Sequence, residues 1–282
     1  MLVDGVKQGS LSLLSIGTRA SRDLALWDFE ASQLQFSVNI DQSIDFTVVS
    51  AARKAVVCGG ADTGVILAIS LTSGSLQQTS RAEEYRGMMD LTVSADSIFV
   101  ATTASGVVII SMTRNVVIGN LHDPAGRLVP TKLLVNSHND GQLIVGYKHG
   151  VIHMFDVDTA TVICCLPGHS GQINSLHQLP SGQLVSASSD QCGIIWNRDL
   201  CMDKESVDEL AGVSEMWTKC KLRGPETGEV VCSDGWETEV NYRVCCYTVD
   251  STQHLLYAGF SCGVIQVFSL DTGQFSIYLS LS

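Results

Sequence analysis

The sequence predicts an all-β protein built from repeated units of short strands. Three observations lead to this fold class. β-Branched and aromatic residues occur in short runs that are separated by turns rich in Gly, Asp, Asn and Ser. No amphipathic stretch of helical length competes with these runs. A similar segment also recurs about every 40 to 45 residues, which is the spacing of a four-stranded repeat.

The most complete unit spans residues 168–198 and reads GHSGQINSLHQLPSGQLVSASSDQCGIIWNR. It starts with a Gly-His pair, continues through two apolar runs joined by a Pro-Ser-Gly turn, and ends in a third run that contains Trp196. This order of features resembles one WD40 repeat. Its second half recurs as GVILAISLTSG from Gly64, HGVIHMFDVDTA from His149, CGVIQVFSLDTG from Cys262, GVVIISMTRN from Gly106 and RDLALWDFEAS near the start.

Six residues share one position when these segments are aligned. They are Trp27, Ile69, Ser111, Phe155, Trp196 and Phe268, at intervals of 42, 42, 44, 41 and 72 residues. Four of the five intervals lie in the range of a four-stranded blade. The resemblance therefore implies a WD40-type β-propeller with six recognisable blades. We expect them near residues 2–40, 41–82, 83–122, 128–168, 169–206 and 241–281.

The last interval is about 30 residues too long for one repeat, and the excess falls between Cys201 and Val240. This segment has ten acidic and four basic residues, a net charge of −6. It is either an acidic insertion at the rim of the fifth blade or a degenerate seventh blade. The second interpretation takes Met216–Leu222 and Glu229–Ser233 as its surviving strands.

We expect residues 1–282 to form a single propeller domain. In many WD40 rings one blade combines strands from both ends of the chain. The first and last units here are nearly in phase, so no shared blade is evident. The chain is then either a piece of a longer polypeptide or an atypically closed ring.

One constellation carries the types of side chain that perform chemistry. The resemblance implies a structural tetrad that links the loops of the fifth unit to its strands, formed by His169, a serine that is Ser186 or Ser188, Asp190 and Trp196. The same types of side chain form the Ser-His-Asp triad of hydrolases. The G-x-S-x-G sequence of a nucleophile elbow does not occur in the chain, so we favour the structural role.

Charge and hydropathy disfavour several classes of partner. The net charge is −12 and no run of five Lys or Arg residues occurs, which disfavours nucleic-acid binding. The apolar runs are much shorter than the roughly 18 to 20 residues that span a bilayer. The start, MLVDGVKQGS, lacks the features of a secretory signal, so we expect a cytoplasmic or nuclear protein.

We expect no metal and no cofactor. The ten cysteines include no CxxC, and the pairs Cys164-Cys165 and Cys245-Cys246 lie in apparent strands, where neighbouring side chains point to opposite faces. His149 and His153 lie four residues apart in an expected strand, which separates them by roughly 13 Å, too far to bind one ion. Neither a P-loop nor a GxGxxG motif occurs.

These observations favour a non-catalytic scaffold or adaptor that binds other proteins within a multiprotein complex. Two alternatives remain open: an architectural subunit of a larger coat or pore-type assembly, and a propeller enzyme whose site is built from loops. The loops that converge on one face of the expected propeller supply the candidate partner-binding residues. They are Glu84, Tyr85, Arg86, Arg127, Tyr147, Lys148, His149, Trp236 and Phe260.

Overall fold

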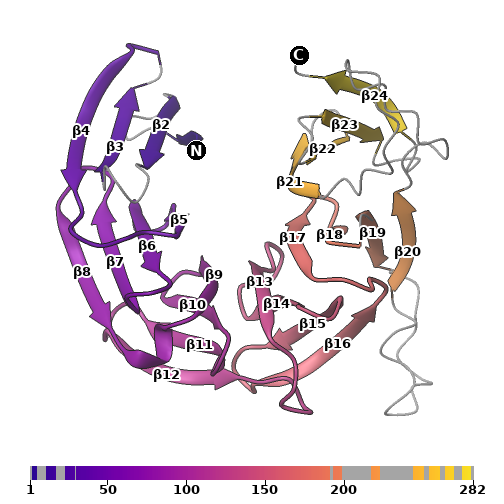
Figure 1. Cartoon of the computed structure of the whole chain (residues 1–282). Helices are drawn as coiled ribbons and strands as arrows, with labels where there is room; N and C mark the ends of the chain where they lie inside the picture. The colour runs from indigo at the N-terminus through magenta and orange to yellow at the C-terminus, as the bar shows by residue number, and fades with distance from the viewer. Residues whose placement is uncertain are drawn as a thin grey trace. The chain divides into compact units, whose positions relative to one another are not determined.

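Figure 1 shows the structure, a computed structural model of the chain. It describes residues 2–4, 11–16, 23–28, 30–190, 193–198, 217–222, 244–250, 254–260, 264–269 and 275–280. The chain divides into two compact units, Met1–Val135 and Asn136–Ser282, and each is described by itself.

The first unit contains three complete four-stranded antiparallel sheets, each formed by consecutive strands. Sheet 1 contains β1 (Leu2–Asp4), β2 (Leu11–Ile16), β3 (Asp23–Asp28) and β4 (Gln33–Asn39). Sheet 2 contains β5 (Phe46–Ser50), β6 (Ala55–Gly60), β7 (Val65–Ser70) and β8 (Leu76–Arg81). Sheet 3 contains β9 (Met88–Val93), β10 (Ser97–Thr102), β11 (Gly106–Ser111) and β12 (Val116–Leu121). The unit ends with β13 (Pro130–Val135), the first strand of sheet 4, which packs beside β9 and β10.

The second unit continues the same order. Sheet 4 is completed by β14 (Gln142–Tyr147), β15 (Val151–Asp156) and β16 (Thr161–Pro167). Sheet 5 contains β17 (Ile173–Gln178), β18 (Leu184–Ser188), β19 (Gly193–Arg198) and β20 (Trp217–Leu222). Sheet 6 contains β21 (Val244–Asp250), β22 (Leu255–Phe260), β23 (Val264–Ser269) and β24 (Phe275–Ser280).

The described residues therefore form six four-stranded sheets, at the positions where the sequence predicts six units. Their one helical element is the single turn η1 (Glu83–Tyr85), and within them no helix is long and apolar enough to cross a membrane. Both findings agree with the all-β prediction.

The fifth sheet departs from the expected boundaries. Its fourth strand is β20, which pairs with β19 from Arg198 opposite Trp217 to Gly193 opposite Leu222. Unit five thus extends beyond residue 206, and Trp217–Leu222 belongs to this sheet instead of a seventh blade. The boundary differs because β18 pairs with only one edge of β19, and a strand that is distant in sequence can pair with the other edge. The remainder of the acidic segment, residues 199–216 and 223–243, lies outside the described residues.

The core of the first unit lies between its sheets, because central strands are apolar on both faces. In β6, Val56 and Cys58 pack against sheet 1, whereas Val57 between them packs against sheet 3. The outermost strands differ: β8 and β12 are largely exposed. This gradient follows from the alternation of side chains in strands that are covered on both faces. In the second unit, Leu179, Val185, Ile195, Leu256, Ala258 and Phe268 form the corresponding cluster between sheets 5 and 6.

A glycine with a positive φ begins the third strand in three of the repeats. The φ angles are 61° at Gly64, 71° at Gly106 and 81° at Gly150. A Cβ atom at these positions would lie 2.5 Å from the carbonyl oxygen of Ala82, 2.6 Å from that of Leu121 and 2.3 Å from that of His169. Each oxygen lies where the chain leaves one sheet for the next. The recurring glycine of the sequence repeat is therefore required by backbone conformation and by close approach.

The structure corrects the alignment of one repeat by a single residue. The pairing of the third and fourth strands shifts register directly before Trp27, Ile69, Ile110 and Phe155. The next residue in each case, Asp28, Ser70, Ser111 or Asp156, accepts a hydrogen bond from the backbone N–H three residues later. Ile110, and not Ser111, is thus equivalent to Trp27. The interval that begins at Ile69 is therefore 41 residues instead of 42, and the next interval, which ends at Phe155, is 45 instead of 44.

Candidate functional site

Four side chains predicted to form a tetrad lie together in sheet 5. His169 precedes β17, Ser186 lies on β18, Asp190 lies in the turn after β18, and Trp196 lies on β19. The His169 Nδ1 atom is 3.0 Å from Asp190 Oδ2, and its Nε2 atom is 2.8 Å from Ser186 Oγ. The Trp196 indole N–H donates to the same Ser186 oxygen at 2.8 Å.

The bonds form one continuous chain from turn to strand. A carboxylate only accepts, so in the neutral imidazole Nδ1 carries the proton and Nε2 accepts from the Ser186 hydroxyl. Asp190 Oδ2 also accepts from the Ser170 backbone N–H at 2.8 Å, which fixes the segment that enters β17. Ser188, the other serine considered from the sequence, accepts instead from the Asp190 backbone N–H at 3.2 Å. The structure therefore places Ser186 in the tetrad and Ser188 in the support of the turn.

The same order of Ser, His and Asp occurs in a hydrolase triad, but two features of this site oppose that chemistry. Ser186 is completely buried, with a relative exposure of 0%, and the His169 side chain is also 0% exposed. The Ser186 oxygen is already engaged by the indole of Trp196. A nucleophile must reach a substrate carbonyl, and this hydroxyl cannot do so without opening the sheet. The arrangement satisfies buried polar groups and holds loops on strands.

Two glycines explain the sequence around the tetrad. A Cβ atom on Gly168 would lie 2.7 Å from the Trp196 ring, and one on Gly171 would lie 2.8 Å from the backbone nitrogen of Asp190. The Gly-His pair of the motif thus combines the hydrogen-bonding ring with the small residue that allows the indole to pack beside it.

Sheet 1 contains half of this arrangement, which sequence reasoning missed. The Trp27 indole N–H donates to Ser15 Oγ on the neighbouring strand at 3.0 Å. Trp27 pairs with Leu13, two residues before Ser15, just as Trp196 pairs with Leu184, two residues before Ser186. Ser15 and Trp27 are 12 residues apart, whereas Ser186 and Trp196 are 10 apart, so a constant spacing in the sequence does not reveal the shared pair.

Comparison with known proteins agrees with this architecture. No family model and no curated protein matches the sequence. Among solved structures, the crystal structure of the Myceliophteria thermophila Cps50 (Swd1) β-propeller domain is similar, with a TM-score of 0.74 at 13% sequence identity. The match covers 100% of this chain and 86% of that chain. The chain has the fold of a WD40-type β-propeller. Each four-stranded sheet is accordingly one blade, and we number the blades as the sheets.

The predicted partner-binding residues divide into exposed and buried groups. In the first unit of the propeller, Glu84, Arg86 and Arg127 are exposed, and Arg86 Nε lies 3.0 Å from Glu83 Oε2. Tyr85 is only 2% exposed and packs in the core between blades 2 and 3. The prediction that Tyr85 is a surface anchor is wrong, because η1 turns the Tyr85 ring inward and leaves Glu84 and Arg86 in solvent.

In the second unit of the propeller, Lys148 and His149 are exposed in the turn between β14 and β15. Tyr147 is 2% exposed, and its ring centroid lies 5.0 Å from that of His153 in an edge-on contact. Its proposed role as an anchor is also wrong, because it ends β14 with its ring in the blade. Trp236 and the side chain of Phe260 lie outside the described residues.

The histidines differ in exposure: His153 and His169 are buried, whereas the other five are exposed. His149 lies in a turn and not in the expected strand, whereas His153 on β15 is buried. Cys164 is buried and Cys165 is half-buried on β16, as neighbours on opposite faces of a strand should be. Burial raises the pKa of the Cys58 thiol to about 12, so this sulfur stays protonated and unreactive at neutral pH.

Proposed function

We propose that this propeller is a non-catalytic scaffold that binds other proteins within a multiprotein complex. The observation that supports this most strongly is the state of the tetrad. Its serine is sealed inside blade 5 and bonded to Trp196, so the residues that could suggest hydrolysis serve the fold. A propeller by itself hosts many unrelated functions, so the fold alone does not indicate which of them this chain performs.

The surface supports binding through turns. Arg86 and Arg127 in the first unit and Lys148 in the second are exposed cations on connections between strands. Loops on a rigid scaffold commonly carry binding residues, and Arg is enriched at interface hot spots. These three residues, together with Glu84 and His149, remain candidate partner contacts. Tyr85 and Tyr147 are buried and are no longer candidates.

Affinity capture with the full chain tests the scaffold function. We expect a defined set of proteins to co-purify in constant proportion, and we expect no turnover in a panel of ester, peptide and phosphoester substrates. The proposal would be contradicted if the purified chain turned over one of these substrates and a single substitution in the chain abolished that activity.

Matched combined variants test the candidate contacts. Arg86→Ala, Lys148→Ala and Trp236→Ala together should leave the fold intact and release the captured partner. The control combines Thr72→Ala, Asp158→Ala and Asp271→Ala, and it should retain the partner. Thr72 and Asp158 lie in the turns before β8 and β16, and Asp271 lies between β23 and β24 in the sequence. Equal capture by the two triple variants would refute the assignment of these contacts while leaving the scaffold function to the first experiment.

A further inference from the structure

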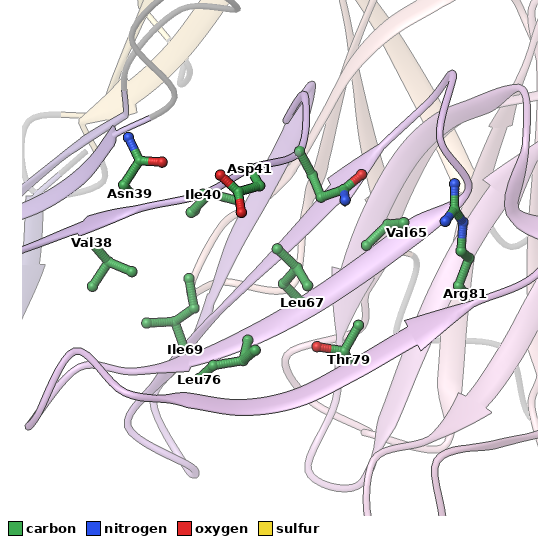
Figure 2. Close-up of a pocket in the computed structure, with 11 residues that line it drawn as sticks. Val38, Asn39, Ile40, Asp41, Val65, Leu67, Ile69, Leu76, Thr79 and Arg81 are labelled. Atoms are coloured by element: carbon green, nitrogen blue, oxygen red, sulfur yellow. The ribbon is translucent and has the colours of Figure 1, made fainter.

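An apolar groove opens in the first unit beside blade 2. It lies between residues 38–42, at the end of β4 and directly after it, and the strands β7 and β8 (Figure 2). Its volume is about 330 Å³. Such a volume is at the lower end of the range of ligand-binding pockets. The lining residues are Val38, Asn39, Ile40, Asp41, Gln42, Val65, Leu67, Ile69, Leu76, Thr79 and Arg81.

The floor of the groove is formed by buried side chains of β7. Val65, Leu67 and Ile69 alternate along β7, so their side chains share one face of the sheet. All three are at most 7% exposed and belong to the core cluster with blade 1. Leu76 of β8 differs, because 56% of it is exposed. It forms a wall of the groove that solvent reaches and that an incoming apolar side chain would cover.

The polar rim carries an available positive charge. Arg81 ends β8 with an exposed side chain, and among the described residues its guanidinium has no ion-pair partner. Asp41, the acidic residue of the rim, already takes part in another interaction. Arg81 therefore offers a cation next to an apolar surface, on a chain whose net charge is −12. A guanidinium binds the carboxylate of a peptide side chain in a specific geometry, through two parallel hydrogen bonds.

Strand addition to β8 is disfavoured although β8 is the edge of its sheet. The Asn115 side chain donates to the Thr79 carbonyl oxygen at 3.1 Å, and its own oxygen accepts from the Gln78 side chain at 2.7 Å. The edge is thus covered near its centre by a side chain from blade 3. An occupant would enter the groove with its side chains and not by extending the sheet.

We propose that this groove binds a segment of a partner protein that presents one or two large apolar side chains beside an Asp or Glu. The apolar side chains fill the space over Val65, Leu67 and Leu76, and the carboxylate pairs with Arg81. This inference rests on the proposed scaffold function and specifies one binding site and the chemistry of its partner.

Selection from a random-peptide phage library against the immobilised full chain tests the proposal, followed by fluorescence anisotropy with labelled synthetic copies of the enriched peptides. Leu76→Asp and Arg81→Glu alter the groove. Leu34→Asp is the matched control for Leu76, because Leu34 is 48% exposed on β4 and pairs with Trp27 as Leu76 pairs with Ile69. Arg114→Glu, in the exposed turn between β11 and β12, is the control for Arg81. Circular dichroism checks that each variant is folded.

We expect enriched peptides that combine apolar and acidic residues. Their affinity should fall about tenfold or more in Leu76→Asp and in Arg81→Glu and stay unchanged in both controls. Replacement of the acidic residues of a peptide by lysine should abolish binding to the native chain and restore it to Arg81→Glu. Enriched peptides that bind all four variants alike, or that lack acidic residues, would overturn the groove as the site. A library that yields no enriched peptide would also overturn the groove proposal. The scaffold function is tested separately, by affinity capture.

Discussion

At the scale of single residues, Ser186 shows how one hydroxyl can organise a blade. It receives the Trp196 indole N–H and contacts His169 Nε2, both at 2.8 Å, while it is completely buried. Removal of the hydroxyl would leave two buried polar groups without their partner. Each such group costs about 1 to 3 kcal/mol.

Ser186→Ala should therefore lower the free energy of unfolding more than Ser188→Ala does. Ser188 is also 0% exposed, but its hydroxyl supports only the backbone N–H of Asp190, which is partly accessible. Each substitution removes one buried serine hydroxyl from β18. The difference between the two losses of unfolding free energy therefore measures the contribution of the tetrad. Urea unfolding monitored by tryptophan fluorescence measures it, and equal losses would show that the tetrad contributes nothing beyond a local turn.

Asp90 and Lys132 provide a second residue-scale case, in which charge links two blades. Burial raises the pKa of the Asp90 carboxyl, although Lys132 and the Leu133 backbone N–H oppose that shift. The Lys132 Nζ atom is 3.5 Å from Asp90 Oδ1, and the Leu133 N–H donates to Oδ2 at 2.8 Å. Because the folded chain binds this proton more tightly than the unfolded chain, ionisation of Asp90 costs stability above its folded pKa. That cost is relieved as the pH falls through this value.

Lys132→Met should then destabilise the chain by about 1 to 2 kcal/mol near pH 7, because it removes the cation that offsets the buried carboxylate. The loss should shrink as the pH is lowered and Asp90 takes up a proton. In an Asp90→Asn background the same lysine substitution should have little effect at any pH, since no charge remains to be offset. Denaturant unfolding of the four chains between pH 8 and about pH 4, the ordinary pKa of an aspartate, completes the cycle. A penalty independent of both pH and residue 90 would show that Lys132 acts through packing alone.

At the scale of strands and turns, the backbone geometry that recurs in the repeats depends on the glycines at the start of the third strands. Gly106 has a φ of 71°, and a Cβ atom there would lie 2.6 Å from the Leu121 carbonyl oxygen. Gly126 has a similar φ of 65°, but a Cβ atom there would meet nothing within 4 Å. Gly126 therefore has a left-handed backbone conformation alone, whereas Gly106 combines this conformation with a close approach between strands.

Gly106→Ala should lower the melting temperature more than Gly126→Ala. Alanine at Gly126 costs only the left-handed conformation, about 1 to 2 kcal/mol, whereas alanine at Gly106 must also displace the backbone that leads into blade 4. Thermal unfolding followed by circular dichroism gives both values. Similar shifts would mean that the turn relaxes around the added methyl group.

The strand and turn pattern made most of this architecture predictable, but it did not fix where side chains point. Alternating apolar runs and glycine turns predict the bounds of five of the six blades to within a few residues. They did not show that Tyr85 and Tyr147 face the core, because a residue next to a turn can rotate to either side of the sheet. They also misassigned Trp217–Leu222, since the pairing of β20 with β19 joins residues that a long acidic segment separates in sequence. The groove was not predictable either, because it is built by residues of two repeats.

At the scale of the whole chain, similar blades are held together by different contacts. Among the described residues, blade 5 has the complete tetrad and blade 1 has its Trp-Ser half. Polar contacts one repeat apart join neighbouring blades elsewhere: Arg53 with Asp96, Asp90 with the Leu133 N–H, and the Ser137 N–H with Gln178. In a repeat protein, stability is approximately the sum of such neighbour contacts and of each unit's own stability. The completeness of each sheet therefore matters to the stability of its neighbours.

The acidic segment tests this view, because β20 lies within it. Replacement of residues 203–239 by a short Gly/Ser linker removes the fourth strand of blade 5 and exposes the edge of β19, so we expect a large loss of stability and a tendency to associate through that edge. Separate replacement of residues 203–213 and 226–239 by linkers of similar length keeps β20 and should preserve the fold. Thermal unfolding and size-exclusion chromatography compare the two chains with the native one. If the complete deletion unfolds at the native temperature and stays monodisperse, β20 is dispensable and the segment behaves as a simple insertion.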